Sequence, residues 1–155
     1  MIYGIGLPRT GTASLTEALK TMGKQTTHYC VLHDSINHEQ YDLAPLNTLA
    51  KVDNSFYREY EDLILEHNHA LFILTTRNKN SWAKSISRFS EKPPDLPDIE
   101  EYTKNVKNVF QSIGAENRLL IVNIFEDEHV FKKISMFLGV TYNKEKMPHI
   151  KRELI

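Results

Sequence analysis

The sequence of 155 residues lacks several features that mark particular classes of protein. It has a single cysteine, Cys30, which excludes an intramolecular disulfide bond and is compatible with a reducing compartment. No apolar run approaches the roughly 18 residues of a membrane-spanning helix, so we expect no membrane association. The 19 basic and 20 acidic residues nearly balance, which excludes an overall basic field for nucleic acid. We also expect no targeting segment before the first strand, and hence a cytoplasmic protein.

Short apolar runs alternate with segments of helical periodicity along the chain. The apolar runs predict strands over residues 1–6, 25–32, 50–53, 70–76 and 118–125. The periodic segments predict helices over residues 14–22, 56–66, 81–89, 98–113 and 130–138, whereas residues 34–49 stay ambiguous. This alternation indicates an α/β fold with a central, mainly parallel sheet and helices on both faces, in a single domain covering residues 1–155.

The segment Gly-Ile-Gly-Leu-Pro-Arg-Thr-Gly-Thr-Ala-Ser-Leu, residues 4–15, joins the first strand to the first helix. Gly6 and Gly11 allow the backbone to turn sharply and to approach an anion closely. The N–H groups at the start of the next helix would point at that anion, and the helix dipole favours its charge. Arg9 adds a fixed positive charge, and Thr12 or Ser14 would cap the helix or contact an oxygen. The segment therefore predicts a phosphate-binding turn; the alternative is a glycine-containing turn that happens to precede a helix.

The same segment departs from the nucleotide-binding P-loop, Gly-x4-Gly-Lys-Ser/Thr, at two positions. Thr12 stands in place of the lysine, and Ala13 stands in place of the hydroxyl residue that binds Mg²⁺. A kinase or nucleoside triphosphatase needs both of those groups. A small-molecule kinase is therefore the weaker alternative, and we expect no metal.

Three chemically notable positions follow predicted strands of the sheet. The loop around Arg9 follows the first strand, Asp53 ends the short third strand, and Arg77 directly follows the most apolar strand. Ligands of open α/β sheets bind at the carboxyl ends of the strands. We therefore expect these residues to share one edge of the sheet, although they are far apart in sequence.

Residues 6–15 resemble the 5′-phosphosulfate loop of P-loop sulfotransferases, which use the donor 3′-phosphoadenylyl sulfate (PAPS). A second hallmark of that family is a strand that ends in arginine, with a serine eight residues later, and Arg77 and Ser85 stand in that relation. Both motifs occur in the family's order, and the similarity is greatest to a branch of small, poorly characterised sulfotransferases. The resemblance covers most of the chain and implies a three-layer P-loop-type fold and a PAPS-dependent sulfotransferase.

The resemblance also implies a role for each matching residue. Arg9 would stabilise charge on the sulfonate and on the bridging oxygen. Arg77, and Ser85 from the first turns of the next helix, would hold the donor's 3′-phosphate, while loop N–H groups would hold its 5′-phosphate. The donor-binding set for PAPS and its product adenosine 3′,5′-bisphosphate (PAP) is Pro8, Arg9, Thr10, Gly11, Thr12, Ala13, Ser14, Arg77 and Ser85.

Sulfate transfer to a hydroxyl or amine of a small acceptor needs a general base, and the sequence offers two candidates. Asp53 is the first, because it ends a strand beside the loop, and His28 in the second strand is the other. Each has a structural alternative: Asp53 would serve as the N-cap of a helix that begins near Phe56, and His28 as a hydrogen-bonded wall residue. The expected catalytic residues are therefore Arg9 and either Asp53 or His28.

Two departures from the family mean that the sequence does not determine how the acceptor binds. The C-terminal Arg-Lys-Gly segment that covers the 3′-phosphate in the hormone-sulfating branch is absent, and Lys151 and Arg152 are the residues that would replace it. The chain is also shorter than typical sulfotransferases. The acceptor is then small, or lies in an open cleft under residues 91–97, or enters a site that a second subunit completes in a homo-oligomer. A catalytically silent module that binds PAP is the main alternative function.

Overall fold

The computed structural model describes residues 1–29, 49–53, 56–89 and 92–140. Cys30, nearly all of the ambiguous segment 34–49, Lys151 and Arg152 lie outside the described residues. The strands are β1 (Ile2–Gly4), β2 (Gln25–Tyr29), β3 (Leu49–Asp53), β4 (Leu71–Thr76) and β5 (Leu119–Asn123). The helices are α1 (Thr12–Thr21), α2 (Tyr60–Glu66), α3 (Lys79–Ser87), α4 (Ile99–Ser112) and α5 (Val130–Leu138), with short 3₁₀ helices η3 (Phe56–Arg58) and η4 (Glu116–Arg118).

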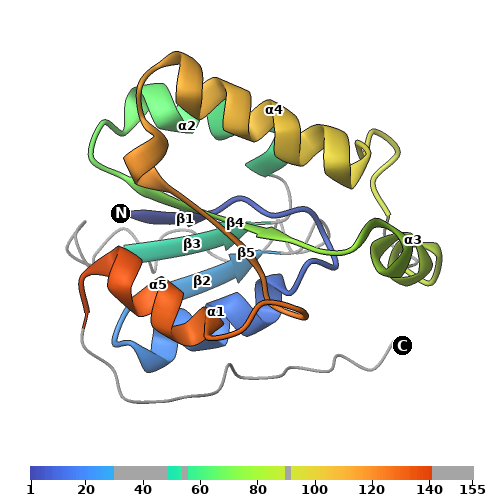
Figure 1. Ribbon diagram of the computed structural model, residues 1–155, viewed down its shortest axis with the longest axis horizontal. Coiled ribbons are helices and arrows are strands. Elements are labelled where there is room, and N and C mark those ends of the chain that lie inside the picture. Colours follow the sequence, from blue (N-terminus) through green and yellow to red (C-terminus); the bar gives the residue numbers. More distant parts are fainter. Residues whose placement is uncertain (30–48, 54–55, 90–91, 141–155) are drawn as a thin grey trace.

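The described strands form one sheet in the order β2-β3-β1-β4-β5, and every neighbouring pair is parallel. α1 and α5 cover one face, α2 and α4 cover the other, and α3 lies beyond the carboxyl ends of the strands (Figure 1). The expected α/β fold with helices on both faces is therefore confirmed. A single domain covering all of residues 1–155 stays a prediction.

Alternating strand residues supply two hydrophobic cores, one on each face of the sheet. Tyr3 and Phe72 belong to the core under α2 and α4, whereas Ile2 and Ile73 belong to the core under α1 and α5. Each of these side chains is at most 5% exposed, so the central strands are buried on both faces. Burial on both faces explains why β4 is a continuous apolar run rather than an alternating one.

Polar side chains fix the starts of the two helices that follow β4. Asn78 Oδ1 accepts hydrogen bonds from the N–H groups of Asn80 and Ser81 at 3.0 and 3.1 Å, so α3 begins two residues before the predicted position. Asp98 Oδ1 caps α4 in the same way, at 3.0 and 3.2 Å. These oxygens satisfy N–H groups that have no partner within the helix. Both helices therefore begin at a defined residue.

Two predicted elements differ from the structure. The helix expected over residues 56–66 is divided into η3 and α2, because Glu59 adopts a non-helical φ of −122°. The first strand is shorter than expected and ends at Gly4, although Ile5 N–H still donates to Ile73 O of β4 at 2.9 Å before the loop turns away. Gly139, with a φ of 68°, ends α5 as predicted. No helix in the described ranges is long and apolar enough to cross a membrane.

Candidate functional site

The loop between β1 and α1, residues 5–11, is the centre of the candidate site. A hydrogen bond from Leu15 N–H to Gly11 O at 3.0 Å begins α1, so the N–H groups of residues 12–14 precede the helical ladder. Those groups carry the positive end of the helix dipole, which favours an anion. Gly11 is the N-cap, with a φ of 91° that suits glycine. Of the two roles expected for Thr12 and Ser14, capping of the helix is therefore wrong, because the N-cap is Gly11, and contact with a ligand oxygen stays a prediction.

Gly6 lies where two buried threonines meet. Thr10 Oγ1 donates to Leu7 O at 2.7 Å and lies 2.6 Å from Thr75 Oγ1 of β4, so Thr75 is the donor of the second bond. A Cβ atom on Gly6 would lie 1.9 Å from Thr75 Oγ1 and 2.7 Å from Thr10 Oγ1. A glycine at this position therefore allows the loop to approach β4 closely enough to form the hydroxyl pair.

Two aromatic side chains hold carbonyl groups of the loop. Tyr102 Oη of α4 donates to Ile5 O at 2.6 Å, and Trp82 Nε1 of α3 donates to Pro8 O at 2.9 Å. Burial raises the pKa of Tyr102 well above its ordinary value, so the phenol stays protonated and can donate. Helices that follow β4 in the sequence thus fix the shape of a loop near the N-terminus.

Arg77 makes a third contact and brings its guanidinium group to the loop. Its Nη1 donates to Arg9 O at 3.0 Å, and its guanidinium carbon lies 4.1 Å from the ring centre of Phe125. Arg77 Nε is buried and has no hydrogen-bond partner among the described residues. Burial, and then the charge of Arg9, lowers the pKa of Arg77. A half-buried charged group with a buried, unsatisfied donor atom is a position where a bound anion would be stabilising.

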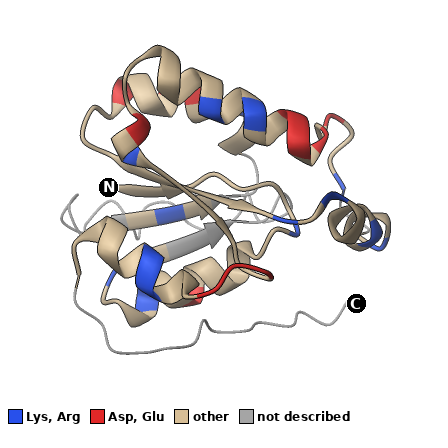
Figure 2. Cartoon of the chain, in the orientation of Figure 1, with Lys and Arg blue, Asp and Glu red and all other residues tan. Residues whose placement is uncertain are grey.

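Arg9 and Ser85 lie at the same place. Arg9 Nε donates to Ser85 Oγ at 2.9 Å, and the guanidinium carbon lies 5.7 Å from the ring centre of Phe89. Figure 2 shows basic residues where the loop, the end of β4 and α3 meet. In the described ranges, no Asp or Glu forms an ion pair with Arg9 or Arg77 within 4.0 Å. Two arginines without a carboxylate, beside a helix N-terminus, form a site whose chemistry selects phosphate or sulfate groups.

A family described as "Sulfotransferase domain" matches residues 1–98, which include the loop and both arginines. The chain belongs to the sulfotransferase family. This membership confirms the resemblance drawn from the two sequence motifs, and the match extends from β1 to Asp98, the cap of α4. A search of curated proteins gave no match.

Two solved sulfotransferase structures share the fold of this family member. Mouse sulfotransferase SULT7A1, in a crystal structure complexed with PAP, has 17% identity and a TM-score of 0.61, and the similarity covers 92% of this chain. This chain spans 60% of the SULT7A1 chain. A sulfotransferase from Alicyclobacillus acidocaldarius has 13% identity and a TM-score of 0.63, covering 98% of this chain and 85% of that one. The three-layer P-loop-type fold is thereby confirmed.

This family member brings its expected donor residues into one cluster rather than two. The sequence assigned Arg9 to the sulfonate, and Arg77 with Ser85 to the 3′-phosphate. In the structure Ser85 contacts Arg9, and Arg77 contacts the backbone of Arg9. Ser85 lies in the last turn of α3, although it was expected near the start of the helix. Of the other expected donor residues, the buried ones are Pro8, Thr10, Thr12 and Ser14, and the half-buried ones are Gly11 and Ala13.

The two candidate bases lie on strands beside the loop. Asp53 is the last residue of β3, the direct neighbour of β1, and pairs with Tyr29. His28 lies in β2 and pairs with Val52, so its backbone is two strands from β1, roughly 10 Å away. Both positions are at the carboxyl edge, and the catalytic role of each stays a prediction. No group of three or more His, Cys, Asp or Glu in the described part of the chain could hold a metal ion.

Sequence reasoning missed the aromatic residues of the site. Phe125 follows β5 and stacks beside Arg77 although its side chain is 44% exposed, and Phe89 lies next to Arg9. The rule that ligand sites lie at the carboxyl ends of strands would have identified Phe125. Phe89 follows α3 and gave no such signal.

The loop expected to cover the site, residues 91–97, is hydrogen-bonded to η3 through Asp95, one of its described residues. Asp95 accepts hydrogen bonds from Arg58 Nε at 2.7 Å and from Tyr57 Oη at 2.8 Å. The hydrogen bonds from Arg58 and Tyr57 hold the pKa of Asp95 well below its usual range. Burial, and then the bond to Asp95, raises the pKa of Tyr57 to about 12. Asp95 therefore anchors the loop beside the aromatic core, and its covering of an acceptor stays a prediction.

Proposed function

We propose that the protein transfers a sulfuryl group from PAPS to a hydroxyl or amine of a small acceptor. The observation that carries this proposal is the convergence of Arg9 and Arg77 beside the α1 N-terminus, with no carboxylate paired to either within the described residues. A kinase would need a lysine and a hydroxyl where this loop has Thr12 and Ala13. Family membership and the PAP bound in SULT7A1 favour PAPS over a nucleoside triphosphate.

The geometry suggests how this chain would hold the donor. The N–H groups at the start of α1 would bind the 5′-phosphate, and the Arg77 guanidinium, with its unsatisfied Nε, would bind the 3′-phosphate. Ser85 Oγ accepts from Arg9 and keeps its own proton, so it could donate that proton to a phosphate oxygen at the same time. Ser85 would then connect the residue at the sulfonate with the residues at the 3′-phosphate.

The chemistry needs charge stabilisation and one proton acceptor. PAPS supplies a sulfuryl group, whose sulfur bonds to the acceptor oxygen or nitrogen while its bond to the 5′-phosphate oxygen breaks, leaving PAP. Arg9 and the α1 N-terminus would stabilise the charge that develops on the departing phosphate. Asp53 or His28 would take the acceptor's proton, because both lie at the same edge of the sheet as the loop.

Binding of PAP compared with ATP tests the donor assignment. We expect PAP at one hundred times its Kd to stabilise the folded protein by about 2.7 kcal/mol in thermal unfolding, and ATP with Mg²⁺ to have less effect at the same concentration. A preference for ATP with Mg²⁺ would support the kinase alternative. Binding of PAP without transfer from PAPS to any acceptor in a broad panel would support the silent module.

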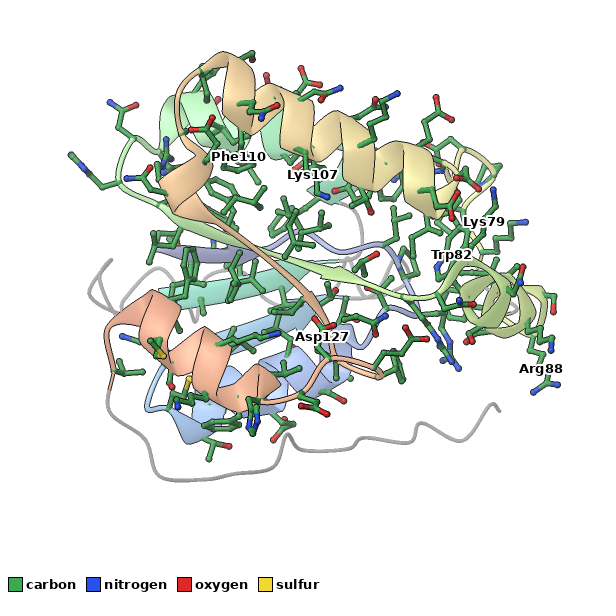
Figure 3. The ribbon with its side chains drawn as sticks, viewed as in Figure 1. Lys79, Trp82, Arg88, Lys107, Phe110 and Asp127 are labelled. Atoms are coloured by element: carbon green, nitrogen blue, oxygen red, sulfur yellow. The ribbon has the colours of Figure 1, made fainter. Side chains whose placement is uncertain are left out.

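Replacing Arg77 with alanine should raise the Kd for PAP by about 10- to 100-fold, because hydrogen bonds to charged groups contribute about 1.5–3 kcal/mol. Calorimetric titration measures this change. Arg88→Ala is the matched control, because Arg88 is exposed at the end of α3 and points away from the loop (Figure 3). Unchanged PAP affinity in Arg77→Ala would show that the 3′-phosphate site lies elsewhere.

A further inference from the structure

A groove of about 530 Å³ runs between α4 and β5 and reaches the donor cluster at one end. Leu119 and Ile121 of β5 form one wall, and Thr103, Lys104 and Lys107 of α4 form the other. Figure 3 shows Lys107 pointing from α4 toward the strands. A volume of this size suits a small organic molecule.

The groove lies at the edge of the described part of the sheet. Among the described strands β5 pairs with β4 alone, and residues of α4 line the groove together with β5. The buried stripe of α4, which includes Val106 and Phe110, faces the core, and the polar stripe beside it overhangs the edge. The result is a mixed surface with an apolar strand below and polar helix residues above. Such a surface fits a ligand with an apolar body and one polar group.

The charge of the polar wall indicates the sign of that group. Glu100 and Glu116 also line the groove, but within the described residues neither carboxylate forms an ion pair with Lys104 or Lys107. Figure 2 shows two basic bands in the middle of α4, next to its acidic first turn. The lining thus has three basic side chains, with Arg77, against two acidic ones. Two lysines one helical turn apart, neither ion-paired with a carboxylate of the described residues, are placed to hold one ligand anion.

The groove ends at the donor cluster. Thr76 and Arg77 line it at the carboxyl edge, and the same Arg77 donates to Arg9 O in the loop. A molecule that fills the groove therefore reaches the residues that would hold the donor. We propose that the groove binds the sulfate acceptor and selects small hydroxylated molecules that carry a carboxylate, with the carboxylate at Lys104 and Lys107 and the hydroxyl directed past Arg77 toward the sulfuryl group at Arg9. This inference rests on the proposed function.

Matched pairs of ligands test the selection for a carboxylate. The probes are 4-hydroxybenzoate, 4-hydroxyphenylacetate and 3-(4-hydroxyphenyl)propanoate, each compared with its neutral amide by calorimetric titration with and without saturating PAP. The proteins are the native chain, the double variant Lys104→Gln with Lys107→Gln, and the control Lys132→Gln with Lys133→Gln. The control removes the same charge from exposed positions of α5 on the opposite face of the sheet.

We expect at least one carboxylate to bind the native chain and the control about 5- to 20-fold more tightly than its amide. In the groove variant, the carboxylate and its amide should bind with about the same Kd. The Kd for PAP should stay the same in all three proteins. The proposal is overturned if no carboxylate is preferred, or if the preference persists in the groove variant. It is also overturned if light scattering shows a dimer that only the groove variant loses, since a second copy would then occupy the groove. Failure of PAP to bind the native chain would instead count against the proposed function.

Discussion

Replacing Arg9 with alanine should lower the rate of sulfate transfer by about two to three orders of magnitude while weakening PAP binding less than about tenfold. The guanidinium group of Arg9 lies in the loop that would face the breaking bond, and its described hydrogen-bond partner is Ser85 rather than a core residue. Arg77 and the start of α1 would still hold the two phosphates of the ground state. The lost interaction is therefore one that strengthens as charge develops in the transition state.

Single-turnover consumption of PAPS with an accepted substrate, together with calorimetry for PAP, separates the two effects of Arg9→Ala. Backbone strain does not confound the comparison, because Arg9 has a φ of 68° and alanine carries the same Cβ atom at that φ. Arg9→Gly removes both the side chain and the strain, so similar kinetics for the two variants would assign the effect to the guanidinium group. Equal losses in transfer and PAP binding would instead make Arg9 a donor-binding residue only.

Gly6→Ala should lower the midpoint of thermal unfolding by about 5–10 °C, which corresponds to about 2–3 kcal/mol for a chain of this length. The new Cβ atom would lie 1.9 Å from Thr75 Oγ1 and 2.9 Å from the backbone oxygen of Thr75. Thr75 is 1% exposed in the central strand β4, so neither atom can move away without disturbing the sheet. The loop would have to separate from β4, and the hydroxyl pair with Thr10 would be lost.

Gly114→Ala is the control for Gly6→Ala. A Cβ atom at Gly114 would meet no atom within 4 Å, but the backbone there has a φ of 65°. It therefore reports the strain of an unfavourable φ alone, about 1–2 kcal/mol. Adding Thr75→Ala to Gly6→Ala removes the contact at 1.9 Å and should recover part of the loss relative to Thr75→Ala alone. If Gly6→Ala costs no more than Gly114→Ala, the close packing of loop and strand is not what requires glycine.

The position of the candidate site could be predicted because parallel strands bring distant residues to one edge. Arg77 follows an apolar run that is buried on both faces, and the same topology places Asp53 one strand from the loop. The contact between Arg9 and Ser85 could not be predicted in the same way. It spans 76 residues and depends on how the axis of α3 lies across the end of the sheet, which no local pattern encodes.

The residues missed by sequence reasoning share a physical cause. Lys104 and Lys107 lie on an amphipathic helix, where charged residues usually face water, and only the edge position of β5 makes them the wall of a groove. Thr75 belongs to a mainly apolar strand, and its importance arises from the hydroxyl group of Thr10, which approaches it from the loop. Phe125 lies in an irregular segment after β5, where periodicity carries no information. Each role depends on a neighbour that is distant in sequence.

The bonds to the loop carbonyl groups have a consequence for how an anion is captured. Trp82 and Arg77 hold the carbonyl oxygens of Pro8 and Arg9, and because a peptide unit is planar and trans, each held carbonyl also sets the direction of the next N–H group. An arriving anion thus meets N–H dipoles that are already oriented. The conformational entropy of these residues is lost when the protein folds, so ordering them adds no cost to the free energy of anion binding. Capture then depends chiefly on how fast an anion reaches the two arginines, and ionic strength will affect that association rate more than the lifetime of the complex.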